Sequence, residues 1–380
     1  TFFIWVFFGG IDVVSYGLFA ALSVLVVACP CVVGLATPVA LAAGLNKAAR
    51  NHILIRDTSA LEQMRNVDVV VFDKTGTLTE GHPTVIGWLW AQGQEEHYKD
   101  VLLAAESTSD HPLAEAIVTA LEGEEQVIPA HLDGFENITG KGVRVAYQGA
   151  EYWVGSHKLL KDYQANLADM LTQYESDGNS IVYFGRENDL LAVIAIKDQL
   201  RVTSMEAIRE LRTQDIEICM LTGDGERTAS SVAGSLGIMR FVADAMPDDK
   251  EDFIHKLQLQ GKTVAMVGDG VNDAQALSCA DVSIAMGKGT DTLMDTAMIT
   301  LRTSDLLLLP KVFRLSRQTV SLMYRNLFWA FIYNTVGIFV AAGVLYPVYD
   351  ILLSPALAGA AMALSCVSVA LSSLRLSSRF

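Results

Sequence analysis

Residues 67–79 read V-D-V-V-V-F-D-K-T-G-T-L-T, an apolar β-branched run that ends in an aspartate and a small polar loop. A short continuous apolar run of this kind is typical of a strand buried on both faces of a parallel sheet. Asp73 stands where the strand ends, and open α/β sheets bind their ligands beyond the carboxyl ends of their strands. The stretch therefore predicts an α/β fold with Asp73 at the ligand-binding edge.

The polar part of the chain alternates strand-like and helix-like patterns, as an α/β sheet requires. Further strands are predicted at residues 216–221, 263–267 and 282–285, and helices at residues 203–212, 226–236 and 248–259. Residues 82–197 separate the first strand from the others and carry strand signals of their own, for example at residues 143–147 and 181–184. We therefore expect one domain of residues 47–81 and 198–310, with a second domain of residues 82–197 inserted into it.

Three stretches without a charged residue account for the high mean hydropathy of +0.32: residues 13–46, 326–349 and 351–374. Each is long enough to cross a bilayer, which takes about 20 mainly apolar residues. We expect residues 1–46 and 311–380 to form the membrane part, with residues 1–8 as the end of a helix that starts upstream. Lysine and arginine flank the polar insert, which predicts that the insert faces the cytoplasm.

The charge of the chain excludes some classes of function. Acidic residues outnumber basic ones by 43 to 28, and the formal net charge is −15. A protein of this charge without a basic stripe is not expected to bind nucleic acid as its main task. Five cysteines, two of them within one apolar stretch, do not form the disulfide framework of a small secreted domain.

Polar clusters follow the other predicted strands as well. T-G-D occupies residues 222–224, Lys250 lies in M-P-D-D-K, and G-D-G-V-N-D occupies residues 268–273. Together with Asp73 they bring a carboxylate nucleophile, a cation for phosphate and further carboxylates to one edge of the sheet. Carboxylates and phosphate oxygens are the ligands that Mg²⁺ prefers. The sequence therefore predicts a phosphoryl-transfer site.

These four motifs, in this order, resemble the signature of the P-type ATPases, relatives of the haloacid dehalogenase phosphotransferases. The resemblance implies an α/β haloacid dehalogenase-like parallel sheet domain with an inserted α+β nucleotide-binding domain, attached to transmembrane α-helices. It implies that Asp73 attacks the γ-phosphate of ATP and becomes an aspartyl phosphate, while Lys250 and Thr222 neutralise the phosphoryl oxygens. The implied Mg²⁺ ligands are Asp73, Asp269 and the Thr75 carbonyl, and the other expected catalytic residues are Lys74, Gly223, Asp224, Asn272 and Asp273.

The residue type at position 75 distinguishes a pump from a phosphatase. Phosphatases of the superfamily have a second aspartate two positions after the nucleophile, where it acts as general acid and base. With threonine at this position, no side chain next to the acyl phosphate activates water. We therefore expect the phosphorylated intermediate to persist, as a pump requires.

The inserted domain carries candidate nucleotide contacts. S-D-H-P-L at residues 109–113 is similar to the S-E-H-P-L of heavy-metal P-type ATPases, which implies that His111 lies near the adenine, with Glu106 close to it. Gly140 and Gly142 resemble a glycine pair that lets the backbone approach the nucleotide. Taken alone, a His-Pro pair is usually a helix entry and a G-x-G is usually a turn.

The first apolar stretch must be broken, because 34 residues in one helix would reach about 50 Å, well beyond a hydrocarbon core of about 30 Å. Pro30 lies between Cys29 and Cys31, and an interior proline removes a helix hydrogen bond; Pro38 is expected to do the same. Unwound backbone at bilayer depth occurs where it lines an enclosed site. Two thiolates there would select Cu(I), Zn²⁺ or a similar soft ion, although buried cysteines are usually small apolar fillers.

C-P-C followed by G-L-A-T-P resembles the metal-translocating helix of heavy-metal P-type ATPases. The expected further ligands of the transported ion are Tyr333, Asn334, Met362, Ser365 and Cys366. Relatives that move Zn²⁺ or Cd²⁺ carry a lysine and an aspartate in these last two spans, and this chain has no charge there. Y-N and M-x-x-S-S are the copper-type patterns, which this chain matches except that Cys366 replaces the second serine.

The sequence therefore predicts the C-terminal part of a Cu(I)-exporting, or Ag(I)-exporting, P-type ATPase that uses ATP and Mg²⁺. We expect an integral protein of a bacterial inner membrane, in contact with lipid and supplied by a copper chaperone or a small-molecule copper donor. No T-G-E motif of an actuator domain is present, so we expect this chain alone to bind nucleotide but not to complete the pump cycle. The alternatives are a Zn²⁺ or Cd²⁺ pump, a membrane-tethered phosphatase and a non-enzymatic metal-binding remnant.

Overall fold

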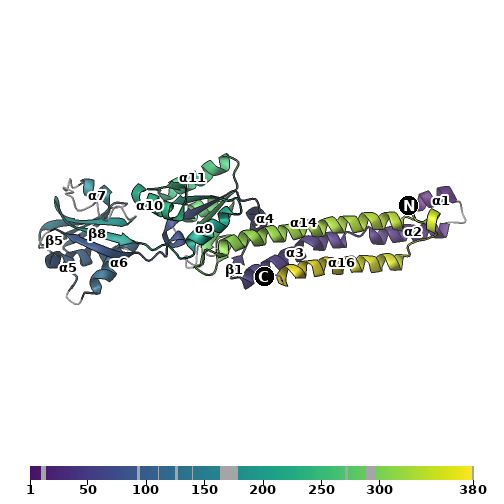
Figure 1. Ribbon diagram of the computed structural model, residues 1–380, viewed down its shortest axis with the longest axis horizontal. Helices are drawn as coiled ribbons and strands as arrows, with labels where there is room; N and C mark the ends of the chain where they lie inside the picture. Colours follow the sequence, from purple (N-terminus) through teal and green to yellow (C-terminus); the bar gives the residue numbers. More distant parts are fainter. Residues whose placement is uncertain are drawn as a thin grey trace. The chain divides into compact units, whose positions relative to one another are not determined.

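The computed structural model describes residues 1–9, 14–91, 95–109, 111–124, 127–138, 140–162, 179–269, 273–287 and 296–378 (Figure 1). The chain divides into two compact units, which we describe separately. The first unit contains the apolar helices, and the second contains the polar insert. Their bounds are Thr1–Asn66, Met298–Arg302 and Leu308–Phe380 for the helical unit, and Val67–Ala297 and Thr303–Leu307 for the α/β unit.

The α/β unit contains a parallel sheet whose strands pair in the order β12-β11-β2-β9-β10. The strands are β2 (Val69–Asp73), β9 (Glu217–Leu221), β10 (Arg240–Val242), β11 (Val264–Gly268) and β12 (Val282–Met286). Its helices are α9 (Ser204–Arg212), α10 (Glu226–Leu236), α11 (Pro247–Leu259) and α12 (Ala274–Cys279). All residues of β2, β11 and β12 are buried, as the continuous apolar runs predict.

A second, antiparallel sheet is formed within residues 84–197, in the order β3-β8-β7-β6-β5-β4. Its elements are β3 (Thr84–Trp90), α5 (Glu95–Glu106), α6 (Pro112–Glu122), β4 (Gly134–Ile138), β5 (Gly142–Tyr147), β6 (Ala150–Gly155), α7 (His157–Asp162), β7 (Ser180–Arg186) and β8 (Asp189–Lys197). Alternate strand residues face two cores: Val154 packs in the core that includes α5 and α6, whereas Trp153 packs with Leu159 of α7. The strands expected at residues 143–147 and 181–184 are present.

The described residues of the helical unit include two segments that are long and apolar enough to cross a membrane, Val14–Arg50 and Pro355–Leu376. Its elements are α1 (Phe2–Gly9), α2 (Val14–Val27), α3 (Cys31–Arg50), β1 (Ile53–Ile55), α4 (Ser59–Met64), β13 (Ile299–Leu301), α14 (Leu308–Ala341), α15 (Tyr346–Tyr349) and α16 (Pro355–Ser378). The long helices lie side by side (Figure 1), and a Cβ on Gly337 of α14 would lie 2.7 Å from Val27 of α2. Strands β1 and β13 pair in an antiparallel way.

The break in the first apolar stretch is confirmed at Pro30, because α2 ends at Val27 and α3 begins at Cys31. Pro38 removes a backbone hydrogen bond, as any interior proline does, but it does not break the helix. Pro38 lies inside α3, which continues for more than three turns beyond it. A helix that packs against α14 and α16 can lose one backbone hydrogen bond and remain helical.

The predicted spans near the end of the chain are also corrected. Residues 326–349 do not form one helix, because α14 ends at Ala341 and the short helix Tyr346–Tyr349 follows a turn. Gly343 in this turn has a φ of +94°, a conformation that stops an α-helix. Residues 351–354 are not helical, and α16 begins at Pro355, because proline suits the first position of a helix but not its interior.

Candidate functional site

Three neighbouring strands of the parallel sheet end at the same edge, and each is followed by a predicted site residue. Strand β2 is paired with β9 on one side and β11 on the other, with Phe72 opposite both Met220 and Val267. Asp73 is the last residue of β2, Thr222 follows β9 and Asp269 follows β11. The order of the strands, and not the order of the residues in the chain, brings these three residues together.

Lys250 connects two carboxylates at this edge. Its Nζ lies 2.5 Å from Oδ1 of Asp73 and 2.7 Å from Oδ1 of Asp273. Lys250 is in the first turn of α11, and Asp273 immediately precedes α12. All three residues are buried. A buried cation between two buried carboxylates is stabilised by its partners, and removal of one partner would leave an uncompensated charge.

Burial also changes the proton affinity of these groups. Desolvation, with the nearby charge of Asp273, raises the pKa of Asp73 to about 7, although Lys250 opposes the shift. Desolvation and Asp273 raise the pKa of Asp269 to about 6, although Arg201 opposes that shift. Burial alone would lower the pKa of Lys250, but Asp73 and Asp273 outweigh it and the pKa is raised. The edge therefore holds more negative charge than one lysine neutralises.

Three of these carboxylates fit a divalent cation. One oxygen each of Asp73, Asp269 and Asp273 lies within 4.8 Å of the other two. Hard oxygen ligands and excess negative charge are the features of a Mg²⁺ site. The donor set thus matches the predicted Mg²⁺ residues Asp73 and Asp269, and Asp273 joins them.

The loop after β2 is shaped by Gly76. Its φ is +72°, and a Cβ built at this position would lie 1.6 Å from Oδ2 of Asp269. Only glycine allows the loop to approach the Asp269 carboxylate so closely.

Two residues that the sequence interpretation did not single out hold the same loop. Arg201 donates from Nε to the carbonyl of Thr77 at 3.0 Å and also hydrogen-bonds the carbonyl of Gly76. Asp198 accepts from the hydroxyl of Thr79 at 2.5 Å and from the backbone N–H of Gly81 at 3.1 Å. The signal for them in the sequence is D-Q-L-R at residues 198–201, which directly follows the last strand of the inserted sheet.

The T-G-D motif is tied to the loop through Lys74, whose Nζ forms an ion pair with Asp224. The hydroxyl of Thr222 donates to the Asp224 carboxylate at 3.2 Å and accepts from the Asp224 backbone N–H at 3.1 Å. Gly223 lies between them and lines the cavity described next. Asn272 lies outside the described residues, and Thr75 has an extended backbone between Lys74 and Gly76.

A cavity of about 990 Å³ joins the T-G-D motif to the antiparallel sheet. Its lining includes all four residues predicted to contact nucleotide, together with Gly223 and Asp224. The four are Glu106, His111, Gly140 and Gly142. Because Asp224 pairs with Lys74, the neighbour of Asp73, the cavity leads from the inserted sheet toward the nucleophile.

Three of these four residues have distinctive local environments. His111 caps α6, its Nδ1 accepting from the N–H of Leu113 at 3.2 Å, so the helix-entry interpretation of His-Pro also holds. Gly142 has no room for a side chain, because a Cβ there would lie 2.1 Å from the carbonyl of Val154. Glu106 is 6% exposed, and desolvation raises the pKa of its carboxyl to about 7.

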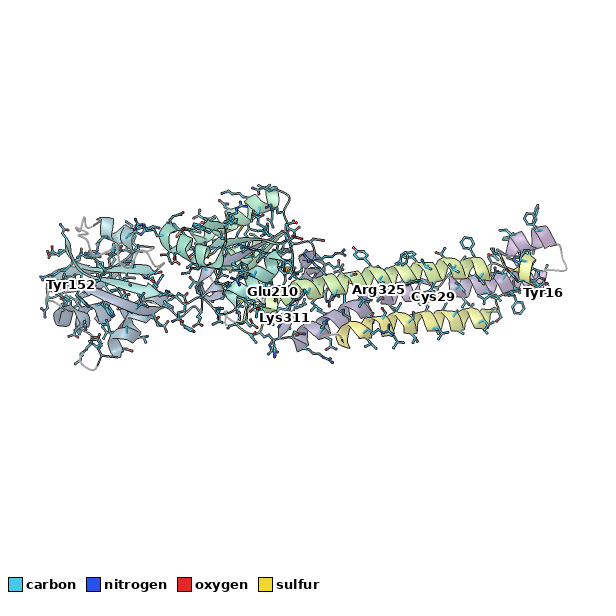
Figure 2. All side chains as sticks on the ribbon, in the orientation of Figure 1. Tyr16, Cys29, Tyr152, Glu210, Lys311 and Arg325 are labelled. Atoms are coloured by element: carbon cyan, nitrogen blue, oxygen red, sulfur yellow. A yellow bond between two sulfur atoms is a disulfide. The ribbon has the colours of Figure 1, made fainter. Side chains whose placement is uncertain are left out.

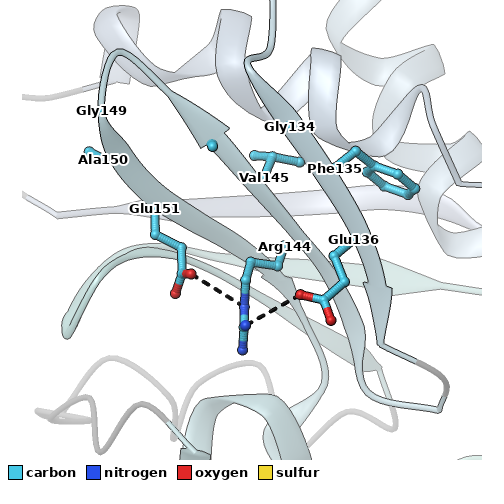
Figure 3. A pocket seen from close by; sticks show the side chains of 9 residues that line it. Gly134, Phe135, Glu136, Arg144, Val145, Gly149, Ala150 and Glu151 are labelled. Carbon is cyan, nitrogen blue, oxygen red and sulfur yellow. Dashed lines mark hydrogen bonds and ion pairs between the residues drawn. The ribbon is translucent and has the colours of Figure 1, made fainter.

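A smaller hollow of about 360 Å³ lies on β4, β5 and β6 (Figure 3). Arg144 lies between two carboxylates there, 3.3 Å from Glu136 and 3.6 Å from Glu151. All three side chains are exposed, and ion pairs between exposed side chains contribute little to the free energy of folding. None of the predicted site residues lines this hollow.

In the helical unit, Cys29 lies in the break between α2 and α3 (Figure 2). Cys31 is the first residue of α3, and the structure joins the two cysteines in a disulfide. The sequence predicted two free thiols here, and the disulfide corrects that prediction. The broken backbone places the two Cα atoms 5.5 Å apart, within the range that a disulfide spans. In this oxidised form neither sulfur is a thiolate, so metal binding would require reduction of the pair.

The other predicted metal ligands differ in how far they are buried in the helical unit. Met362 and Cys366 of α16 are half-buried and pack with Val32 of α3. Ser365 is buried, and both its hydroxyl and Oδ1 of Asn334 lack a hydrogen-bond partner among the described residues. Tyr333 is 46% exposed and lies against Trp329, with ring centroids 5.9 Å apart. The structure therefore brings Met362 and Cys366 to the start of α3 and leaves the Tyr333 ring largely on the surface of this unit.

Comparisons with known proteins identify the family of the α/β unit. The haloacid dehalogenase-like hydrolase family matches residues 67–281. Among solved structures, a zinc-transporting PIB-type ATPase in the E2.Pi state is 33% identical with a TM-score of 0.73, over 96% of this chain and 58% of that one. The catalytic domain of the CPx-ATPase CopB-B is 28% identical with a TM-score of 0.57, over 71% of this chain and 98% of that one.

Curated relatives extend the similarity to the helical unit. A copper-exporting P-type ATPase of Legionella pneumophila is 44% identical over 99% of this chain and 51% of the relative. A silver exporting P-type ATPase of Salmonella typhimurium is 44% identical over 100% of this chain and 46% of the relative. The chain thus spans about half the length of these relatives. It belongs to the haloacid dehalogenase-like hydrolases, and it is a homologue of the copper- and silver-exporting P-type ATPases.

Proposed function

We propose that the chain is the phosphorylated and metal-translocating part of a pump that exports Cu(I), or Ag(I), at the expense of ATP. The observation that carries the proposal is the buried group of Asp73, Lys250 and Asp273 at the edge of the sheet. It supplies a nucleophile and a fixed positive charge at one place. The names of the curated relatives, which export copper or silver, support the choice of cargo.

The proposed chemistry begins with ATP in the cavity between Glu106 and Asp224. A carboxylate oxygen of Asp73 attacks the γ-phosphorus, the bond to the bridging oxygen breaks, and ADP leaves with that oxygen. Lys250 and the hydroxyl of Thr222 neutralise charge on the phosphoryl oxygens. Mg²⁺, held by Asp73, Asp269 and the Thr75 carbonyl, would supply further neutralisation of the phosphates when bound. Lys74 and Asp224 orient the loop. Asn272 is included among the catalytic residues on the basis of its sequence motif.

We propose that the reduced Cys29–Cys31 pair binds the cargo, with Met362 of α16 as the thioether ligand. Thiolates and thioethers are soft ligands that favour Cu(I). Residues 326–341 of α14 and 355–374 of α16 contain no charged side chain to balance a divalent ion. Ser365, Cys366, Tyr333 and Asn334 complete the proposed pathway. The membrane would be a bacterial inner membrane with the α/β unit in the cytoplasm, and a copper chaperone or a small-molecule donor would deliver the ion.

A Zn²⁺ pump is the second candidate, because a solved zinc-transporting PIB-type ATPase has the same fold over most of this chain. The two candidates differ in the ion that stimulates phosphorylation or turnover. We expect Cu(I) and Ag(I), under reducing conditions, to stimulate ATP hydrolysis by the full-length pump, whereas Zn²⁺ and Cd²⁺ do not. Stimulation by the divalent ions alone would reject the copper assignment.

The test of the chemical step is incorporation of label from γ-labelled ATP. The parent chain is expected to form an acid-stable phosphoprotein that hydroxylamine cleaves, and Asp73→Asn is expected to form none. Asp73→Asn keeps the size of the side chain, and unchanged nucleotide binding would show that it is folded. Labelling of Asp73→Asn at the parent level would refute the aspartyl phosphate.

Thr75→Asp tests the choice between pump and phosphatase. It places a carboxyl group two residues after the nucleophile, where it can activate water. General acid–base groups contribute about 100-fold to 10,000-fold to a rate, so the labelled intermediate of Thr75→Asp should lose phosphate at least about 100-fold faster than the parent. If the parent intermediate is already as short-lived as that of the variant, the chain is a phosphatase.

A further inference from the structure

We propose that Glu251, His255 and Cys279 form a binding site for a Zn²⁺-type transition-metal ion, separate from the Asp73 site and from the membrane cysteines. Glu251 and His255 lie one turn apart on α11, and Cys279 is the last residue of α12, which packs against α11. One potential ligand atom of each lies within 4.8 Å of the other two. The three residues therefore offer an oxygen, a nitrogen and a sulfur at one point.

Two of the three distances between the ligand atoms fit tetrahedral coordination. Sγ of Cys279 lies 3.4 Å from Oε1 of Glu251, and Nε2 of His255 lies 3.6 Å from the same oxygen. Bonds of about 2.0–2.3 Å in a tetrahedral Zn²⁺ site place neighbouring ligand atoms about 3.3–3.8 Å apart. An ion can thus enter between these atoms with little movement of the two helices.

Gln258 forms hydrogen bonds to two of the three residues. Its Nε2 donates to the backbone carbonyl of Cys279 at 2.9 Å, so its Oε1 is the atom that lies 3.2 Å from Nδ1 of His255. An amide oxygen only accepts, so Nδ1 carries the proton of the neutral imidazole and Nε2 presents a lone pair toward Glu251. Metal-binding histidines are held in the required tautomer by such a bond to the other ring nitrogen.

The type of donors selects the class of ion. A mixed sulfur, nitrogen and oxygen set suits Zn²⁺, whereas Mg²⁺ takes oxygen alone and Cu(I) favours sulfur ligands. The His255 side chain is 51% exposed and that of Glu251 is 35% exposed, so the ion can arrive from solvent and keep a water as fourth ligand. Cys279 would bind the ion as the thiolate, so binding at neutral pH displaces a thiol proton.

The site would tie together two helices that carry catalytic groups. Glu251 follows Lys250 directly in α11, and α12 follows Asp273 directly. Lys250 and Asp273 are joined by their own ion pair, and a metal between α11 and α12 adds a second link. Bound Zn²⁺ is therefore expected to raise the thermal stability of the α/β unit, because it binds the folded arrangement of the two helices and not the unfolded chain.

The test uses the full chain in detergent, reduced, with Cys29→Ser, Cys31→Ser and Cys366→Ser so that the membrane cysteines do not bind metal, and with excess Mg²⁺ to occupy the carboxylates near Asp73. Zn²⁺ binding is measured by competition with a chromogenic chelator, and Co²⁺ is used as a spectroscopic substitute. We expect one Zn²⁺ per chain and a thiolate-to-Co²⁺ charge-transfer band.

Cys279→Ser and His255→Ala should each weaken Zn²⁺ binding at least tenfold, and Cys279→Ser should abolish the charge-transfer band. Gln258→Leu, which removes the orienting hydrogen bonds, should weaken binding by a smaller factor. His131→Ala and Cys219→Ala, at a histidine and a cysteine outside the cluster, serve as controls and should bind like the parent. The Zn²⁺-dependent rise in melting temperature should be lost in the first two variants only. Equal binding by parent and cluster variants, or no stoichiometric binding by the parent, would overturn the proposal.

Discussion

Nζ of Lys250 lies 2.5 Å from Oδ1 of Asp73, and each of the two side chains is only 8% exposed. The lysine thus favours the ionised form of the nucleophile before any phosphate arrives, because its charge opposes the desolvation that raises the pKa of Asp73 to about 7. When the Asp73 oxygen becomes part of an acyl phosphate, the same ammonium group faces the phosphoryl oxygens. The Lys250 ammonium group therefore stabilises negative charge both before the proposed step, on the Asp73 carboxylate, and after it, on the phosphoryl oxygens.

Replacement of Lys250 by methionine should abolish this double role. We expect incorporation of label from γ-labelled ATP to fall at least about 100-fold, because one fixed charge at the reacting group is worth about 3 kcal/mol or more. The unfolding free energy should fall by about 3 kcal/mol, since Asp73 and Asp273 remain as buried unpaired carboxylates. Lys256→Met, at an exposed position on the same helix, should change neither quantity. A Lys250→Met chain that labels like the parent would contradict the assignment.

Gly76→Ala tests the close approach of the loop to Asp269. The added Cβ would lie 1.6 Å from Oδ2 of Asp269, so either the loop or the carboxylate must move. Gly149→Ala is the matched control, because Gly149 has a similar φ of +76° but no atom within 4 Å of the added Cβ. Both variants should lose about 1 kcal/mol of stability from backbone strain. Only Gly76→Ala should lose Mg²⁺-dependent phosphorylation, by tenfold or more; equal activities of the two would argue against a role for this contact.

Arg201→Gln should loosen the loop without touching substrate. The guanidinium group hydrogen-bonds the carbonyls of Gly76 and Thr77, and glutamine can replace one of these bonds at most. A misplaced nucleophile lowers the rate of phosphorylation, and about 100-fold is a typical cost of a 1 Å displacement. The affinity for ATP should stay the same, because the cavity does not include Arg201. Single-turnover labelling separates the two effects, with Arg209→Gln at an exposed position of α9 as control. A loss of affinity alone would exclude the positioning role.

Glu106 predicts a dependence of stability on pH. Its pKa rises from 4.5 to about 7 on folding, because burial disfavours the charged form. Below pH 4.5 the carboxyl is protonated in both states, and between pH 4.5 and 7 only the folded state keeps the proton. The unfolding free energy should therefore fall as the pH rises through this interval, by up to about 3 kcal/mol, and then level off.

Glu106→Gln cannot ionise, so this fall should be absent and the variant should be more stable than the parent at pH 8. Urea denaturation followed by tryptophan fluorescence between pH 5 and 8 measures the difference. Glu115→Gln, at an exposed position of α6, should leave the parent profile unchanged. If Glu106→Gln and the parent have the same stability at pH 8, the Glu106 carboxyl is not desolvated in the folded chain.

Several parts of the fold could be predicted from local patterns. The β-branched runs that end at Asp73 and Leu221 form strands, because a continuous apolar run with a polar end has few other places in a soluble domain. The break at Pro30 follows from the missing N–H of proline. Such features depend on residues that are neighbours in the chain, which is why the printed order of residues is enough to find them.

Other features could not be predicted from local patterns, because packing decided the outcome. Pro38 carries the same local signal as Pro30, yet α3 continues through it because α14 and α16 support the helix from outside. Uncharged composition extended the predicted span to Tyr349, but Gly343 in a left-handed conformation ends α14 at Ala341. Composition alone does not show where a chain reverses its direction. The state of Cys29 and Cys31 likewise depends on how close the broken helix brings them.

The residues that carry the chemistry can be recognised from their order in the chain: the aspartate after a buried strand, the lysine and glycine motifs that accompany it, and the Cys-Pro-Cys in an apolar stretch. Which of these residues meet depends on how the elements pack. The hold of Arg201 and Asp198 on the loop, the bridge of Lys250 to Asp73 and the cluster of Glu251, His255 and Cys279 join segments that are far apart in the chain. Strand order and helix packing set these distances, and neither is a property of any local stretch of residues.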